Sequence, residues 1–297
     1  MADPLLPLVA GIELGGTKSI AVLARGLEVL DEVRVPTTTP AETLGALSET
    51  VARWDGITAI GVGSFGPIAV DPTAADYGRM QATPKPGWAE TDVLEPFARA
   101  GVAVVLDTDV GAAALAEGRW GAARGCATHA YVTIGTGIGV GLVANGATVH
   151  GFLHPELGHL RARRLVGDTF AGICAWHGDC LEGLASGPAI AARAGKAGAD
   201  LAADDPVWVA VAADLAEMVV ALLLAAAPER IVFGGGVGLG QAAHLLPRVR
   251  TGVGKRLNAY LPLERAGGVE AIIVPAALGD RAGPLGTVAL AMRALGV

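Results

Sequence analysis

Residues 8–23 read LVAGIELGGTKSIAVL, in which two apolar stretches flank a Gly-Gly-Thr turn. Short apolar runs that end at turn residues are typical of buried β-strands. We therefore expect strands at residues 8–14 and 19–23. Residues 27–35 roughly alternate between apolar and polar side chains and predict a third strand. The chain is thus expected to begin with an antiparallel meander.

The strand–turn–strand pattern returns later in the chain. Residues 131–134 predict a strand, Gly135-Thr136-Gly137 a turn, and residues 138–143 a returning strand. Gly15 of the first turn and Gly135 of the second are 120 residues apart. This partial duplication indicates two related lobes that face a common cleft.

The segments around the two turns alternate between strand and helix patterns, as in α/β folds. In the first lobe we expect helices at 41–54 and 110–117 and strands at 57–62 and 102–106. In the second lobe we expect a helix from near Ser186, a helix at 205–226, and strands at 231–233 and 269–274. A last helix at 285–295 is expected to cross back. The predicted N-terminal lobe is therefore 1–119 plus 285–297, and the C-terminal lobe is 120–284.

Composition narrows the class of protein. The chain has 297 residues, of which 52% are hydrophobic and 17% charged, enough for two sizeable cores and unlike a disordered protein. The net charge of −7 provides no basic surface for nucleic acid or anionic membranes. The longest apolar run, 218–227, is too short to span a bilayer, and Met1 opens no signal peptide. Three cysteines make no disulfide framework, so we expect a cytoplasmic protein.

Two of the three cysteines lie in the pattern Cys174-x2-His177-x2-Cys180. Zinc is usually held by four nitrogen and sulfur ligands in a tetrahedron, and His159 is the nearest candidate for the fourth. The alternative is a pair of buried thiols beside a solvated loop. Glu156 and Glu182 flank the segment. A metal ion bound between them would fix both carboxylates in place around a small hydroxylated substrate.

The glycine-rich turns are candidates for phosphate binding. Backbone N–H groups approach an anion closely where no Cβ intervenes, while Thr17 and Thr136 add hydroxyl donors and Lys18 adds a cation. Neither turn matches a Walker P-loop or a Rossmann fingerprint. Each turn taken alone favours a plain hairpin, and only the pair favours a polyphosphate clamp.

Asp107-Thr108-Asp109 follows an apolar strand, at the end of which ligands gather in open α/β sheets. A carboxylate there would accept the proton of an attacking hydroxyl, as phosphoryl transfer requires. The alternative is a helix cap, a role that fits Asp107 or Thr108 because a helix is expected to begin nearby.

Taken together, these motifs resemble the ROK family of sugar kinases over nearly the whole chain. The resemblance rests on Glu13–Lys18, Asp107–Asp109, Gly135–Gly137, Glu156–His159, the cysteine cluster and Gly234–Gly236. Three further stretches resemble the fructokinase branch, namely Gly63–Ile68, Thr83–Trp88 and Cys180–Ala189. The resemblance implies an α/β, two-lobed actin-like (ribonuclease H-like) ATPase fold with duplicated mixed-sheet domains.

The resemblance also implies roles for individual residues. Asp109 would be the general base, and the sugar site would comprise Gly66, Glu156, His159 and Glu182. ATP would be bound by Gly15, Gly16, Thr17, Lys18, Thr133, Gly135, Thr136, Gly137, Pro188, Gly235, Gly236, Val237, Gly238 and Leu239. Glu13 would help to hold Mg²⁺, and zinc would be bound by His159, Cys174, His177 and Cys180. The partners would be a sugar and ATP, and the assembly a homodimer.

The implied activity is ATP-dependent phosphorylation of the 6-hydroxyl of D-fructose. One departure is Gly111, where fructokinases of this branch usually have Asn. Three alternatives remain: a kinase for glucose, mannose or N-acetylmannosamine; a sugar-responsive repressor; and a sugar- or nucleotide-binding protein with weak turnover. Repressors of the family carry a helix-turn-helix domain ahead of the first phosphate turn, for which the residues before Gly11 leave no room.

Overall fold

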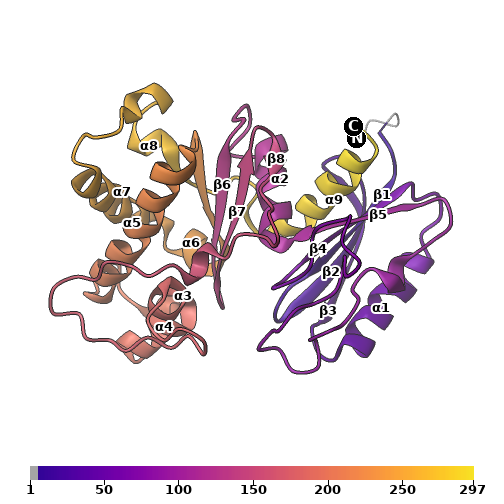
Figure 1. Cartoon of the computed structure of the whole chain (residues 1–297), viewed down its shortest axis with the longest axis horizontal. Helices are drawn as coiled ribbons and strands as arrows, with labels where there is room; N and C mark the ends of the chain where they lie inside the picture. Colours follow the sequence, from indigo (N-terminus) through magenta and orange to yellow (C-terminus); the bar gives the residue numbers. More distant parts are fainter. Residues whose placement is uncertain (1–5) are drawn as a thin grey trace. The chain divides into compact units, whose positions relative to one another are not determined.

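The computed structural model describes residues 6–297, which form two compact units (Figure 1). The first unit comprises residues 6–120, 148–155 and 281–297, and the second comprises 121–147 and 156–280. The sequence-based division differs slightly at two boundaries, residue 120 and residues 281–284, and more substantially at residues 148–155, all of which belong to the first unit. Two histidines of the 148–155 segment, His150 and His154, bond to groups of the first unit.

The first unit contains a five-stranded sheet in the order β3-β2-β1-β4-β5. β1, β2 and β3 pair antiparallel, which confirms the predicted meander, while β4 and β5 continue the sheet in parallel with β1. The strands are β1 Val9–Leu14, β2 Lys18–Arg25, β3 Glu28–Pro36, β4 Ala59–Ser64 and β5 Ala103–Thr108.

Helices cover both faces of this sheet. Alternate residues of β1 point to opposite faces, so Ile12 and Leu14 pack with α1 (Pro40–Ala52), whereas Val9 packs with α9 (Ala282–Ala294). α1 begins at a Thr39 capping box that includes Glu42, with Pro40 in its first turn.

α9 lies unusually close to the sheet and to α2 (Asp109–Trp120). A Cβ atom on Gly61 of β4 would overlap the Thr287 backbone oxygen, and one on Gly286 would overlap the Ala112 backbone of α2. Because glycine has no side chain, the backbone of α9 approaches the backbones of β4 and α2 closely. This packing fixes the position of α2, and with it that of Asp109.

The second unit contains a five-stranded sheet in the order β10-β9-β6-β7-β8. β6 and β7 are antiparallel around the second glycine turn, and β9 and β10 run parallel to β6. The strands are β6 His129–Ile134, β7 Ile138–Ala144, β8 Ala147–Thr148, β9 Arg230–Gly234 and β10 Ile273–Pro275. The helices are α3 Leu181–Ala185, α4 Gly187–Ala194, α5 Val207–Ala226, α6 Gly235–Gly240, α7 Ala242–Leu257 and α8 Val269–Ile272.

The strand predicted at 269–274 is wrong over most of its length. Residues 269–272 form α8, and only the following Ile273–Pro275 are a strand. The amides of Ala271 and Ile272 donate to the Gly268 carbonyl, so the chain turns helically directly after two glycines. A short apolar run does not distinguish a strand from a buried helical turn.

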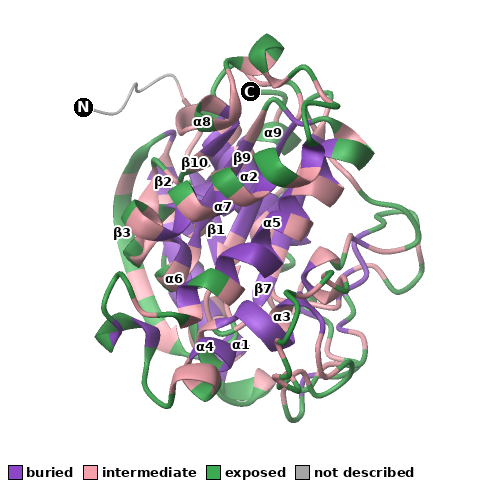
Figure 2. Ribbon diagram, turned by 90° about the vertical axis from the view of Figure 1, so that its left-hand side faces the viewer, coloured by how far each residue is buried: buried purple, intermediate pink, exposed green. Residues whose placement is uncertain are grey.

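α5 forms the centre of the second unit's core. Its 20 residues are long and apolar enough to cross a membrane by length and composition, more than the run at 218–227 indicated. Trp208, Leu215 and Met218 are nevertheless fully buried among strand and α7 side chains. Figure 2 shows buried residues concentrated in the sheets and the helices packed on them. The hydrophobicity of α5 is thus accounted for by core packing.

Candidate functional site

The carboxyl ends of three strands meet at one edge of the first unit's sheet. In the parallel register, Leu14 of β1 is paired with Ser64 of β4, and Ser64 with Thr108 of β5. Glu13, Gly66 and Asp109 lie at or just beyond these ends. The register therefore gathers the predicted residues of this unit at the edge where α/β sheets bind ligands.

Asp109 is the first residue of α2 and is partly exposed. Thr108 is the helix cap, because its Oγ1 accepts from the Gly111 amide at 2.9 Å, as one of the two capping alternatives predicted. The Asp109 carboxylate accepts from the Val110 amide at 2.8 Å. Burial, followed by the negative charge of Glu13, raises the pKa of Asp109 to about 7. A carboxylate with this pKa is well matched to proton abstraction near neutral pH.

Glu13 lies against the first turn of α9. A Cβ atom on Gly283 would overlap the Glu13 carboxylate, so the carboxylate lies directly against the helix backbone. The N-terminus of a helix carries partial positive charge, which favours an anion in this position. Glu13 is therefore a stabilised carboxylate close enough to Asp109 to affect its pKa, and oxygen ligands of this type suit Mg²⁺.

The first glycine turn joins β1 to β2 and exposes its central residues. Gly16, Thr17 and Lys18 are exposed, and nothing lies within 4 Å of the place where a Gly16 Cβ would be. The Lys85 ammonium donates to the Gly16 carbonyl at 2.7 Å. Lys85 therefore adds a second cation to the turn. The Thr83–Trp88 stretch, in which Lys85 lies, resembles the fructokinase branch, but its contact with the first turn was not predicted.

A buried histidine packs against Gly66 and bonds to the backbone two residues later. The Ile68 amide donates to His154 Nε2 at 3.1 Å, and a Cβ on Gly66 would lie 2.9 Å from the same ring. Burial lowers the pKa of His154, which favours the neutral ring that this acceptor role requires. The role of His154 was not predicted either, although it stands only two residues before Glu156.

In the second unit, the turn Gly135-Thr136-Gly137 is supported by α3 and α4. The Glu182 carboxylate accepts from the Ile138 amide at 3.1 Å, and the Gly187 amide donates to the Gly135 carbonyl at 2.8 Å. Pro188 follows in the first turn of α4, with Ser186 as the cap. The predicted residues Thr136 and Pro188 are both exposed.

The glycine run after β9 lies beside Thr133. β6 and β9 are parallel, with Thr133 paired with Gly234. Gly235 has φ of +76°, and a Cβ there would lie 2.6 Å from both Thr133 Oγ1 and the Ile134 carbonyl. The predicted residues Gly235–Leu239 form most of α6, next to the end of β6.

The four predicted zinc ligands form one cluster. One nitrogen or sulfur atom each from His159, Cys174, His177 and Cys180 lies within 4.8 Å of the others. His159 Nδ1 is 3.4 Å from Cys180 Sγ, and both His159 Nδ1 and His177 Nδ1 are 3.8 Å from Cys174 Sγ. Tetrahedral zinc places such ligand atoms about 3.3–3.8 Å apart, so the cluster fits the ion.

The surroundings of the cluster also fit a cation. Burial raises the pKa of Cys180 to about 11, so a thiolate at this position needs a positive partner. The other ring nitrogen of His159, Nε2, lies 4.0 Å from the Glu156 carboxylate, which places negative charge beside the cluster. Cys180 immediately precedes α3, the helix that carries Glu182. The cluster thereby links the Glu156 loop to the carboxylate that bonds to the second turn.

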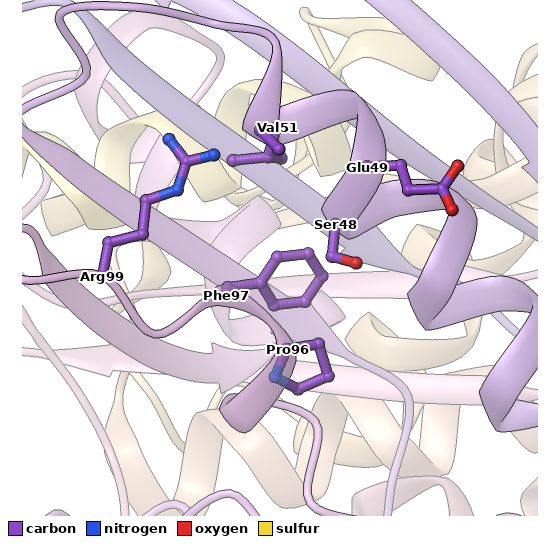
Figure 3. Close-up of a pocket in the computed structure, with 7 residues that line it drawn as sticks. Ser48, Glu49, Val51, Pro96, Phe97 and Arg99 are labelled. Atoms are coloured by element: carbon purple, nitrogen blue, oxygen red, sulfur yellow. The ribbon is translucent and has the colours of Figure 1, made fainter.

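A shallow pocket of ≈ 250 Å³ lies elsewhere on the first unit, beside α1. Figure 3 shows Pro96 and Phe97 facing Ser48 and Val51, with Arg99 at one side. None of the predicted site residues lines this pocket.

The chain matches the ROK family over residues 9–294. It is 41% identical over 290 residues to the fructokinase of Pediococcus pentosaceus (97% of this chain, 99% of that one) and 43% identical over 293 residues to the fructokinase of Zymomonas mobilis (95% and 96%). Among solved structures it resembles the ROK hexokinase of Thermus thermophilus, with a TM-score of 0.76, 28% identity and coverage of 97% and 99%. The fold is thus the actin-like ATPase fold, and the chain belongs to the ROK family.

Proposed function

We propose that this protein is a fructokinase that transfers the γ-phosphoryl group of ATP to the 6-hydroxyl of D-fructose. Support comes from the fructokinases of two organisms that are more than 40% identical to it over nearly their whole length. The observation that carries the chemistry is Asp109, a carboxylate with a pKa of about 7 at the carboxyl edge of the sheet.

In the proposed reaction, Asp109 takes the proton of the fructose 6-hydroxyl. The hydroxyl oxygen forms a bond to the γ-phosphorus as the bond to the β-phosphate oxygen breaks, giving fructose 6-phosphate and ADP. Below pH 7 the Asp109 carboxyl increasingly carries its own proton and loses this capacity. Since Thr108 caps the helix, the Asp109 carboxylate is not required for that role.

The phosphate groups of ATP are assigned to the two glycine turns, with Thr17, Lys18, Thr133 and Thr136 as donors. Exposed backbone amides in a turn without Cβ atoms are suited to anions. Glu13 is the proposed carboxylate for Mg²⁺, which supplies charge neutralisation at the phosphates when bound. Pro188 and Gly235–Leu239 are the proposed border of the adenosine.

We assign recognition of the sugar hydroxyls to Glu156, His159 and Glu182, with a backbone contact from Gly66. A site that bonds particular hydroxyls discriminates against a sugar that leaves these groups unpaired. Zinc is the proposed ion of the cysteine cluster. With four protein ligands it keeps no open position for a water nucleophile, so its role is structural.

A coupled ADP-release assay over fructose, mannose, glucose and N-acetylmannosamine tests the proposal, with the product assigned by ³¹P NMR. Fructose is expected to give the highest kcat/KM and a 6-phosphate. If another hexose exceeds fructose tenfold, the sugar assignment fails and the kinase assignment survives. If no hexose reacts, both fail. Light scattering checks the proposed homodimer, which would have twice the chain mass of 29.8 kDa.

A further inference from the structure

In the first turn of α2, the carboxylate of Asp107 occupies the space beside Gly111 that a side chain at this position would otherwise fill. A Cβ atom on Gly111 would overlap the Asp107 Oδ1 atom and lie 2.9 Å from Thr108 Oγ1. Asp107 is buried, with 1% of its surface exposed. The Asp107 carboxylate thus occupies the position that any side chain at residue 111 would need.

A histidine from a distant segment bonds to this buried carboxylate. His150 Nε2 lies 3.1 Å from Asp107 Oδ1. His150 belongs to residues 148–155, the segment that is part of the first unit although its flanking residues belong to the second. The hydrogen bond that His150 donates to the Asp107 carboxylate raises the pKa of His150, so the contact has the character of an ion pair.

Asp107 connects His150 to the helix that carries the proposed base. Asp107 Oδ1 also accepts from the Thr108 amide at 2.7 Å, and Thr108 Oγ1 accepts from the Gly111 amide at 2.9 Å. Asp109 lies between these two anchored points, in the same turn. Fixing the residues on either side restricts where the Asp109 carboxylate can lie.

We infer that Asp107 and His150 are positioning residues for Asp109, and that the missing side chain at Gly111 makes room for the pair. The inference rests on the proposed function, which itself uses neither Asp107 nor His150. Positioning matters because displacing a reacting group by 1 Å costs up to about 10²-fold in rate.

Gly111→Ala places a methyl group where the Asp107 carboxylate now lies. Alanine favours a helix over glycine by about 1 kcal/mol, so a purely local effect would leave the protein as stable or more stable. We expect kcat to fall roughly 10- to 100-fold with KM for ATP unchanged. Gly45→Ala is the matched control, because Gly45 is also helical and nothing lies within 4 Å of its Cβ position. Its kcat should equal that of the wild type.

A double-mutant cycle then tests the pair itself. Asp107→Ala and His150→Ala should each lower kcat, and the double variant should be no worse than either one. Gly111→Ala should cost nothing further in the Asp107→Ala background, since the overlap is gone. His150→Gln, which retains an N–H donor, should recover part of the loss. Additive effects, or a kcat that none of the four changes alters, would overturn the inference.

Two measurements keep this outcome separate from failure of the proposed function. Thermal melting shows which variants are folded, and if Gly111→Ala is not, the His150 variants decide, since that side chain is 24% exposed. The ¹⁵N shift of His150 Nε2 should change in Asp107→Ala whatever the substrate is. A wild type that fails to phosphorylate fructose contradicts the proposed function, whereas an unchanged His150 resonance contradicts the pair.

Discussion

The two glycine turns have similar sequences and different supports. The first, Gly15–Thr17, is held by polar contacts to neighbouring chain segments, including Lys85 on the Gly16 carbonyl and Thr37 on the Gly15 carbonyl. The second, Gly135–Gly137, is followed by an amide that bonds to Glu182, and Glu182 lies on the helix that begins after Cys180. One turn thus depends on side chains from other segments of its own unit, and the other on a carboxylate tied to a cysteine–histidine cluster.

This difference implies that substitutions in the two regions should have different effects on activity, metal content and stability. The proposed base Asp109 lies at the sheet edge of the first turn, where no cysteine or histidine of the cluster is found. Loss of Asp109 should therefore impair chemistry and spare the metal. Loss of the cluster should release α3 and the second turn, and so affect stability together with binding.

The largest effect is expected at the first region, from Asp109→Asn. The amide keeps size and hydrogen bonding and removes the proton acceptor, so kcat should fall by about 10²–10⁴-fold. Calorimetry should show fructose binding retained, and metal analysis should show the zinc content of the wild type. Turnover within a few-fold of the wild type would remove Asp109 from the mechanism.

Removing one ligand of the cysteine–histidine cluster should destabilise the second region. Purified protein is expected to contain about one zinc ion per chain, as a single four-ligand site requires. Cys180→Ser should lose the metal and lower Tm, because binding of a structural zinc is coupled to folding. Cys126→Ser is the matched control, since Cys126 lies outside the cluster and should leave both quantities unchanged. Zinc-free protein with wild-type Tm and activity would contradict the assignment.

Glu182→Ala tests the link between the cluster and the second turn. It leaves the Ile138 amide without its carboxylate acceptor, a loss worth about 1–3 kcal/mol for a buried group. KM should rise for ATP and for fructose, with zinc retained. Glu182→Gln keeps an acceptor oxygen and should raise KM for ATP much less. If the two variants raise KM for ATP equally, Glu182 does not support the turn.

The paired motifs show how far the sequence carried the prediction. The strand–turn–strand repeats, the four-ligand cluster and the antiparallel meander could all be predicted, because each follows from residue types at short spacing. The contacts of His150 and His154 could not be predicted in this way. Both histidines act on residues more than 40 positions away, Asp107 and Ile68, and only the placement of residues 148–155 in the first unit brings them there.

The predicted strand at 269–274 failed for a local reason. Its apolar residues suit a strand or a buried helical turn equally, and Gly267 and Gly268, both at positive φ, start the turn. Lys85 was missed because a lysine in a Pro- and Gly-containing stretch usually faces solvent. Its contact with Gly16 spans 69 residues and has no signature in spacing.

The pH dependence of activity and of stability tests the role of Asp109 in the first region. Because Asp109 has a pKa of about 7, kcat/KM for fructose should rise with pH, with a midpoint near 7 and about a tenfold difference between pH 6 and 8. Folding stability should run the other way. The raised pKa stabilises the folded state below the unfolded value of 3.8, and this contribution is lost as pH rises through about 7. Asp109→Asn should therefore melt higher than the wild type at pH 8 and not at pH 4.

The smallest effect is expected for Lys85, the second cation at the first turn. Lys85→Met keeps the length of the side chain and removes the donor to the Gly16 carbonyl, a bond worth about 0.5–1.5 kcal/mol. We expect KM for ATP to rise about two- to tenfold, with Tm and zinc content unchanged. Lys196→Met is the matched control, because Lys196 is exposed in the second unit and belongs to neither turn. Since salt screens exposed charges, the difference between the Lys85 variant and the wild type should shrink at high ionic strength. A KM for ATP equal to that of the control would mean that the first turn binds phosphate through its backbone, Thr17 and Lys18 alone.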